Sequence, residues 1–322
     1  MLVGHPEQQR TFLDAWASGR MHHAWLLAGP GGIGKATFAR AAAAYVLASA
    51  AGPADALPAD RIEVPAEHRI AKLIAAGSHL DLRTLAREER DSGGLAANIS
   101  VDQVRSLQPV FRSTPGLSPW RVVIVDAIDD MNRAAANAFL KNLEEPPANT
   151  LFLLVSHAPG RLLPTIRSRC RILRFQPLGD EEVRGVLRGQ LPDADAAEID
   201  ALVPLAEGSP GRALRFAGLD IDGLNRSLAG LAAAPRPQRQ ALALALAKSL
   251  AGKAAQPRYE AFLELAPAFI AAHAASRQGA DLARTVALWE RAQGLGAQAL
   301  PLSLDAQSVA FELASLVAAL EG

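Results

Sequence analysis

Three short, mostly apolar runs mark the first half of the chain, at residues 24–28, 121–125 and 151–156. Each ends at a polar or turn-forming residue, which is typical of parallel strands that are buried on both faces. Residues 35–51 and 132–145 are long enough to form helices between these runs. The alternation of buried strands with helices predicts an α/β domain with a doubly wound parallel sheet flanked by helices.

The pattern changes after this α/β domain, which we expect to span residues 1–175. Pro177 and Gly179 mark the change, and residues 176–219 show helical patterns without a strand signal, which predicts a small helical lid. In residues 220–322, Ala and Leu recur three and four positions apart, which predicts a separate all-α domain. Such helices pack closely, and packing within the domain is a simpler interpretation than a face for partner helices.

Composition and charge exclude several classes of protein. The 322 residues include 33 basic and 33 acidic side chains, which argues against a protein that coats DNA through global positive charge but leaves room for a local basic patch. The longest apolar stretch, residues 41–52, is shorter than the ~20 residues that span a bilayer. The N-terminus lacks the apolar core of a signal peptide. The single cysteine, Cys170, excludes an internal disulfide and fits a reducing compartment, so we expect a cytoplasmic protein with no membrane partner.

The strongest local motif is Gly29-Pro-Gly-Gly-Ile-Gly-Lys-Ala36, which follows a predicted strand and opens a predicted helix. This is the context of a phosphate-binding P-loop. Its glycines let backbone N–H groups converge on phosphates, the helix N-terminus adds its dipole, and the lysine adds a charge. A glycine-rich turn without nucleotide is the simpler alternative. If ATP or ADP binds, the residues predicted to hold it are Gly29, Gly31, Gly32, Gly34 and Lys35.

Two groups that a hydrolysing P-loop enzyme needs are absent. The last motif position requires Ser or Thr as a Mg²⁺ ligand, but Ala36 stands there, and Thr37 points about 100° away around the helix. Asp126 ends a predicted strand where the Mg²⁺-coordinating carboxylate of such enzymes sits, so it joins the candidate nucleotide site. Ala127 follows it, where such an ATPase carries a glutamate that polarises water. Together these losses predict a degenerate nucleotide site without hydrolysis.

Three later segments carry more specific motifs. Residues 137–147 contain Leu-Glu-Glu-Pro-Pro, residues 156–159 are Ser-His-Ala-Pro, and residues 163–170 end in Ser-Arg-Cys. In this order and spacing they resemble the AAA+ clamp-loader family of bacterial DNA polymerase III. Because of Ala36 and the Asp126-Ala127 pair, the chain is most similar to the delta-prime branch of that family.

The resemblance covers nearly all of residues 1–215 and implies a helical collar, through which subunits oligomerise, over residues 220–322. It implies that Arg169 is an arginine finger that enters the ATP site of a neighbouring subunit, a role compatible with lost hydrolysis in this chain. The implied partners are the other clamp-loader subunits in a hetero-oligomeric ring, the sliding clamp, and primed DNA within the complex. The implied function is clamp loading for a DNA-directed DNA polymerase holoenzyme, with no cofactor required and no catalysis by the chain alone.

The chain also departs from the family's pattern. Many members carry four cysteines that form a zinc module after the P-loop helix, whereas residues 45–80 contain none, so we expect no metal site. In residues 208–214, which resemble the family's second nucleotide sensor, Gly211 occupies the usual arginine position and Arg212 follows one place later. No partner base is evident for Cys170, which favours packing over nucleophilic chemistry.

Two other functions remain open. An ATP-hydrolysing motor of the same fold would need Thr37 or water to replace the missing hydroxyl. It would also need Asp129 or Asp130 to activate water, although these acids more simply suit a helix N-terminus. A small-molecule P-loop kinase would leave the Ser-Arg-Cys motif and the helical C-terminal block unexplained. Three basic residues are candidates for DNA contact, although a solvated surface also explains them: Arg161, Arg167 and Arg171.

Overall fold

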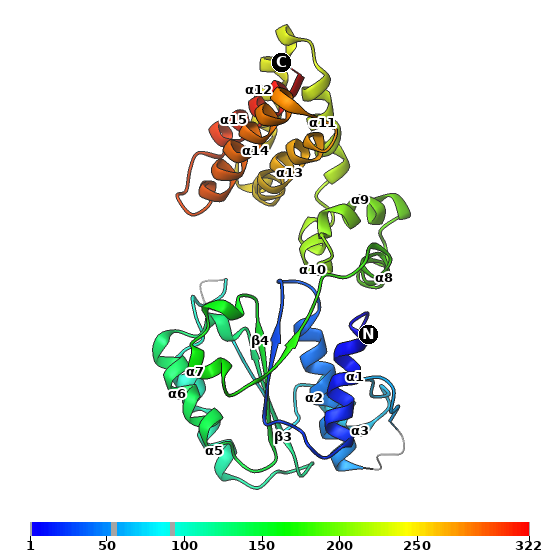
Figure 1. The fold of residues 1–322 in the computed structure, drawn as a ribbon, viewed down its shortest axis with the longest axis vertical. Helices are drawn as coiled ribbons and strands as arrows, with labels where there is room; N and C mark the ends of the chain where they lie inside the picture. Colours follow the sequence, from blue (N-terminus) through cyan, green and yellow to red (C-terminus); the bar gives the residue numbers. More distant parts are fainter. Residues whose placement is uncertain (1, 53–56, 91–93, 322) are drawn as a thin grey trace. The chain divides into compact units, whose positions relative to one another are not determined.

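The computed structural model describes residues 2–52, 57–90 and 94–321. The chain divides into two compact units (Figure 1). The first comprises residues 1–190 and 206–212, and the second comprises residues 191–205 and 213–322. The segment 176–219 is therefore shared between the units, and the three-domain limits stay a prediction.

A five-stranded parallel sheet forms the centre of the first unit, with strand order β2-β3-β4-β1-β5. Trp25 in β1 lies opposite Leu153 in β4 and Arg171 in β5. The predicted parallel α/β sheet is confirmed. The strands are β1 (Ala24–Ala28), β2 (Leu82–Ala86), β3 (Arg121–Asp126), β4 (Thr150–Ser156) and β5 (Arg171–Arg174).

Side chains alternate between the two faces of this sheet, and both faces are covered. Trp25 and Leu27 pack with Phe38 in one apolar cluster. Leu26, between them in the sequence, packs with Phe139 in the other cluster. Burial on both faces explains why the central strands consist of almost unbroken apolar runs.

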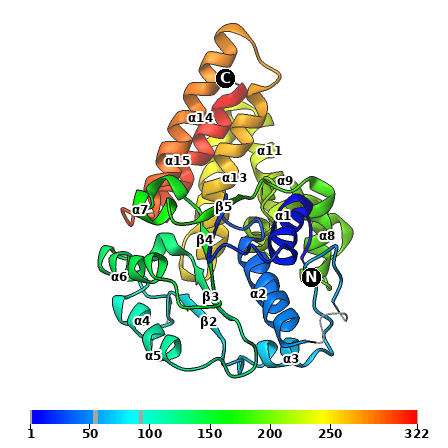
Figure 2. The ribbon, with the colours of Figure 1, turned by 60° about the horizontal axis from the view of Figure 1, so that its bottom comes forward.

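Helices cover the sheet on both sides, with α1–α3 on one face and α4–α7 on the other (Figures 1 and 2). Local capping fixes several helix starts: the Ser100 hydroxyl accepts from the Gln103 N–H, and the Asn132 side chain accepts from the Ala135 N–H. The elements of this unit are α1 (Pro6–Ala17), α2 (Lys35–Ala51), α3 (Arg69–Ala75), α4 (Val101–Arg105), α5 (Leu107–Arg112), η2 (Ile128–Asp130), α6 (Arg133–Glu144), η3 (Pro159–Arg161), α7 (Pro164–Arg167) and α8 (Asp180–Gln190), with most of α10 (Pro210–Ala213).

Helices are the only regular secondary structure in the described residues of the second unit, and the predicted helical C-terminal region is confirmed. Its helix α15 contacts α11, α12, α13 and α14 and buries a face that includes Ala310, Leu313 and Ala314. Gly296 allows α14 to approach α13, because a Cβ there would lie 2.9 Å from the Leu263 carbonyl oxygen. Within the described ranges, no helix combines the length and apolar character needed to cross a membrane. Its elements are most of α9 (Ala196–Ala206), then η4 (Leu214–Phe216), α11 (Ile221–Ala233), α12 (Arg236–Leu250), η5 (Lys253–Ala255), α13 (Gln256–Ala274), α14 (Gly279–Ala299), α15 (Ala306–Ala318) and η6 (Ala319–Glu321).

Candidate functional site

The predicted phosphate-binding loop connects β1 to α2. Gly32 and Gly34 have φ angles of 77° and 101°, in the left-handed region that favours glycine. Gly34 is the N-cap of α2 and offers no side-chain cap to the first N–H groups of the helix. The loop is tightly packed at its start, because a Cβ on Gly29 would lie 2.5 Å from the Phe175 carbonyl oxygen. The strand–loop–helix geometry of a P-loop is therefore present.

Lys35 is turned back onto the loop that carries it. Its side chain is 2% exposed, and its Nζ donates to the Gly29 carbonyl oxygen at 2.7 Å and to that of Pro30. Burial lowers the pKa of Lys35 from 10.5 to about 8, although the carboxylates of Asp129 and Asp126 oppose the shift. The ammonium that would meet a phosphate is thus engaged by carbonyl oxygens of its own loop.

Two other segments hold the loop from outside. The Gly211 N–H, at the start of α10, donates to the Gly32 carbonyl oxygen at 2.9 Å. A Cβ on Gly211 would lie only 2.8 Å from the Gly32 Cα, so the two backbones are in close contact. On the other side, the His5 ring Nε2 lies 2.7 Å from the Ile33 carbonyl oxygen. Arg212, beside Gly211, forms an ion pair with Glu207.

The carboxylate of Asp129 is fully engaged at the carboxyl edge of the sheet. It accepts from the Ser156 hydroxyl at 3.0 Å, from the His157 N–H at 2.7 Å and from the Ala158 N–H at 3.1 Å. Ser156 ends β4 and the other two donors follow it, so Asp129 joins the end of β4 to the turn after β3. The sequence analysis did not predict this role, although the polar pair Ser156-His157, where a buried strand ends, was the available signal.

The remaining charged groups at this edge are also close to one another. Asp126 ends β3, and both it and Lys35 act on the pKa of His157, which is lowered mainly by burial and further by the Lys35 charge, against the opposing carboxylates. Asp130 forms an ion pair with Arg87, with Nε and Oδ2 3.2 Å apart. Asp126 is therefore close enough to Lys35 for its carboxylate to act on the Lys35 pKa, while Asp129 and Asp130 are engaged by other partners.

The side chains at this loop do not fit a magnesium-bound triphosphate. Ala36 presents a methyl group where a hydroxyl ligand is needed. Thr37 instead lines a separate cavity of about 580 Å³, together with Leu2 and Arg40. Over residues 2–52, 57–90 and 94–321, no group of three or more His, Cys, Asp or Glu residues could hold a metal ion.

Arg169 lies between α7 and β5, away from this loop in the sequence. Its side chain is 35% exposed, and its guanidinium makes two contacts. Nη1 donates to the Thr165 carbonyl oxygen at 3.0 Å, and Nη2 lies 3.0 Å from Oε1 of Glu144, at the end of α6. The Leu-Glu-Glu-Pro-Pro and Ser-Arg-Cys motifs therefore meet through one ion pair, a contact that their separation in the sequence did not reveal.

Cys170 and Arg171, which follow Arg169, both contact other side chains of the α/β unit. Cys170 packs against the α6-side core, and burial raises the pKa of its thiol to about 12. The Arg171 guanidinium lies 4.6 Å from the ring centre of Trp25, a cation–π contact. Packing therefore accounts for Cys170, as the sequence favours, and the exposed Arg171 has a ring partner within its own chain.

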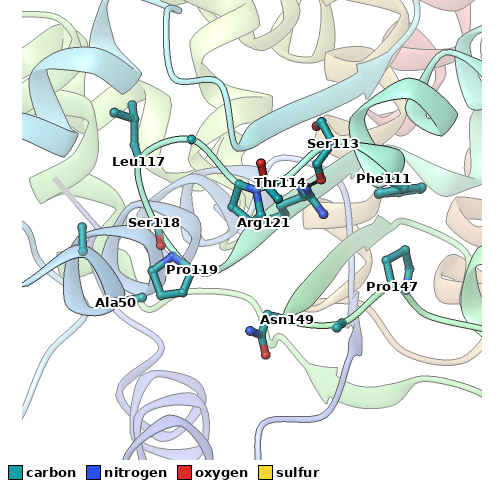
Figure 3. Close-up of a pocket in the computed structure, with 14 residues that line it drawn as sticks. Ala50, Phe111, Ser113, Thr114, Leu117, Ser118, Pro119, Arg121, Pro147 and Asn149 are labelled. Carbon is teal, nitrogen blue, oxygen red and sulfur yellow. Dashed lines mark hydrogen bonds between the residues drawn. The ribbon is translucent and has the colours of Figure 1, made fainter.

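A separate pocket of about 640 Å³ lies at the amino edge of the sheet, where β3 and β4 begin (Figure 3). Figure 3 shows the side chain of Arg121 between the loop that carries Ser113 and Thr114 and the turn that carries Pro147 and Asn149. Parallel strands place this edge opposite the P-loop, and none of the predicted site residues lines the pocket. The pocket is thus separate from the candidate site.

Comparison with known proteins assigns the family. The sequence profile described as "DNA polymerase III, delta subunit" matches residues 4–179, more than half of the chain. The chain belongs to this family. The match confirms the predicted clamp-loader resemblance, and the relatives below place it near the delta-prime type.

Two delta-prime relatives illustrate the similarity. The DNA polymerase III subunit delta' of Pseudomonas aeruginosa is 39% identical over 218 residues, which cover 67% of this chain and 62% of that protein. The delta' subunit of Escherichia coli is 34% identical over 206 residues, which cover 62% of this chain and 56% of that protein. The chain therefore matches less than two thirds of the length of either relative.

Related subunits of other types are also similar. The DNA polymerase III subunit gamma/tau of Mycobacterium tuberculosis is 31% identical over 231 residues, 72% of this chain but 37% of that protein. Among solved structures, a DNA polymerase III gamma subunit-related protein from Thermotoga maritima superposes with a TM-score of 0.53 and 16% identity, covering 98% of this chain and all of that one. At that identity the superposition establishes the fold alone.

Proposed function

We propose that this chain is a non-hydrolysing, delta-prime-type subunit of a bacterial clamp loader. In this proposal it supplies Arg169 in trans to the ATP site of a neighbouring subunit and helps to load the sliding clamp onto primed DNA for DNA polymerase III. The chain itself needs no cofactor and performs no catalysis alone. It works in the cytoplasm, where chromosomal replication takes place in bacteria.

The observation that carries the proposal is the contrast between the two candidate sites. At the P-loop, the Lys35 ammonium is buried on the carbonyl oxygens of Gly29 and Pro30, and Ala36 offers no metal ligand. Arg169, by contrast, keeps a partly exposed guanidinium. A guanidinium that reaches a phosphoryl group stabilises the charge of the transition state by on the order of 10³–10⁵ in rate. An arginine presented at the surface can act in a neighbour's site even when the chain's own site cannot.

The helical unit supports the assignment of a partner-binding collar. It exposes five leucines, two in α12 and three in the segment that joins α14 to α15, and in this proposal they contact partner helices. We propose that residues 220–322 oligomerise with other clamp-loader subunits, that residues 176–219 form the lid, and that residues 1–175 form the AAA+ domain. The exposed leucines are Leu242, Leu244, Leu300, Leu302 and Leu304.

An ATP-hydrolysing motor is the second candidate, favoured by the similarity to a gamma/tau subunit. It needs a free carboxylate to activate water. Asp129 is engaged by three donors, and Asp130 is paired with Arg87. These contacts favour the non-hydrolysing proposal. Weak binding of ATP or ADP to the loop's backbone N–H groups and Lys35 remains a prediction.

A steady-state ATPase assay of the purified chain separates the two candidates. We expect no turnover with Mg²⁺ and ATP, and no difference between the wild type and Lys35→Ala. Mg²⁺-dependent hydrolysis by the chain alone that Lys35→Ala abolishes would overturn the proposal in favour of the motor.

A further inference from the structure

The guanidinium of Arg169 is held by an anion of its own chain. Nη2 lies 3.0 Å from Oε1 of Glu144, and Nη1 donates to the Thr165 carbonyl oxygen at 3.0 Å. The first contact joins two elements, α6 and the turn before β5, whereas the second lies within one turn of α7. Glu144 is therefore the group that restrains the guanidinium from outside its own segment.

The ion pair with Glu144 engages Arg169 through the same N–H donors that an arginine finger uses to bind a phosphate. A guanidinium carries five N–H donors and no acceptor, and it binds carboxylate and phosphate oxygens alike. While Nη2 faces Glu144, that nitrogen is directed at a carboxylate of its own chain. A phosphate in a neighbouring subunit must compete with Glu144 for Arg169.

The strength of the pair suits a reversible restraint. Both side chains are partly exposed, at 35% for Arg169 and 48% for Glu144. Exposed ion pairs are weak and screened by salt, and they shift an equilibrium by about fivefold at most. Such a pair competes with a bound triphosphate for the guanidinium, so it lowers the fraction of subunits whose finger reaches the phosphate without abolishing it.

From this geometry we infer that Glu144 is a positioning residue that competes with a neighbouring subunit's bound ATP for the arginine finger. The inference rests on the proposed role of Arg169 in trans. Charge competition at Arg169 then suppresses hydrolysis in the assembled ring before the clamp and DNA engage. Neutralising Glu144 releases the finger and raises this basal rate.

The chain supplies a matched control one residue away. Glu145 has the same charge and follows Glu144 at the end of α6, but in the described part of the chain it forms no ion pair. Glu145→Gln therefore removes the same charge from the same helix end without touching Arg169. Any general effect of charge on assembly or ATP binding appears in both variants.

The experiment measures ATP hydrolysis by the complex reconstituted with its ATPase subunit, at saturating ATP, without clamp or DNA. We expect Glu144→Gln to raise the rate about two- to fivefold, Glu145→Gln to leave it unchanged, and Arg169→Ala to lower it. The ratio between Glu144→Gln and wild type should fall towards one as salt is raised from about 0.05 M to 0.5 M, because the pair is screened. A merely structural role for Glu144 gives no such salt dependence.

The other outcomes are distinguishable. If Arg169→Ala lowers the rate while Glu144→Gln matches the wild type, the restraint is overturned and the proposed function stands. If Glu144→Gln lowers the rate as Arg169→Ala does, Glu144 orients the finger productively, and the restraint is again overturned. An unchanged rate in Arg169→Ala overturns the proposed function and the restraint together. Thermal unfolding of each variant confirms that the chains compared are folded.

Discussion

The phosphate-binding loop and the Ser-Arg-Cys turn are parts of the same α/β unit, but they differ in how their charges are satisfied. Lys35 is 2% exposed and bonds to carbonyl oxygens of its own loop. Arg169 is 35% exposed and held by one surface carboxylate, Glu144. Buried hydrogen bonds within the loop thus hold Lys35, whereas an ion pair at the surface holds Arg169.

The comparison shows that the backbone shape of a phosphate-binding loop can be kept while its side chains do not offer the groups that bind a nucleotide and a metal. The left-handed glycines that shape the loop remain at Gly32 and Gly34, because β1 and α2 still need that connection. At that loop Ala36 has no side-chain oxygen, and the Lys35 ammonium bonds to carbonyl oxygens of its own loop. The arginine that would act on another molecule has stayed at the surface.

The largest effect we expect concerns Cys170, beside the exposed arginine. Burial raises the pKa of its thiol from 9.0 to about 12, which lowers the thiolate fraction near pH 8 by about 10³-fold. Reaction of the folded chain with a chromogenic disulfide reagent should be slower than that of the denatured chain by a comparable factor. Equal rates would show that the turn is open at Cys170 as well as at Arg169.

The next effect tests the internal closure at the sheet edge. Asp129→Asn should lower the free energy of unfolding by about 2–4 kcal/mol, because it leaves two backbone N–H groups and a hydroxyl without their charged acceptor. Asp130→Asn is the control, since its partly exposed pair with Arg87 contributes about 0–1 kcal/mol. Denaturant unfolding compares the two. Equal losses would contradict the structural role of Asp129.

Lys35 should give the α/β unit a distinctive pH dependence. Its folded-state pKa of about 8 lies below the ordinary value of 10.5, so between these values the unfolded chain binds more protons and stability rises with pH. Between pH 8 and 9.5, the free energy of unfolding should increase by up to about 2 kcal/mol more in the wild type than in Lys35→Met. Below pH 8 the two should run parallel. Identical profiles over the whole range would mean that the ammonium is solvated and the loop open.

The smallest effect concerns the contact between α10 and the loop. Gly211→Ala places a Cβ 2.8 Å from the Gly32 Cα, so the segments must separate at a cost of about 1–2 kcal/mol. Gly230→Ala, in α11, meets open space and should be neutral or stabilising by up to about 1 kcal/mol. Thermal unfolding measures both. A neutral Gly211→Ala would show that α10 does not hold the loop.

The central strands could be predicted from the sequence because burial on both faces leaves an apolar run. The edge strands could not. Residues 82–86 and 171–174 alternate with charged or polar side chains and are mostly exposed or half-buried, so local hydrophobicity carries no strand signal there. Their pairing depends on neighbours far away in the sequence.

In the candidate site too, local sequence features could be predicted, whereas contacts between distant segments could not. The glycine spacing is a local feature, and it predicted the strand–loop–helix geometry of the loop. The missing hydroxyl at Ala36 is also local, and the loss of hydrolysis that it implies stays a prediction. The contacts that engage Asp129 and Arg169 join segments 27–29 and 25 residues apart, so no local pattern records them. The hydrogen bonds from Lys35 to the carbonyl oxygens of its own loop could not be predicted either. The same glycine-rich motif occurs in loops whose lysine binds a phosphate.

The central claim is that the chain acts through Arg169 in a neighbour's site. The most direct test is hydrolysis and clamp loading by the reconstituted complex carrying Arg169→Ala, with Arg174→Ala, a nearby exposed arginine at the end of β5, as the control. We expect Arg169→Ala to assemble normally and to slow the site it completes by on the order of 10³-fold, while Arg174→Ala behaves as wild type. A complex with Arg169→Ala that hydrolyses ATP and loads clamps at the wild-type rate would contradict the account.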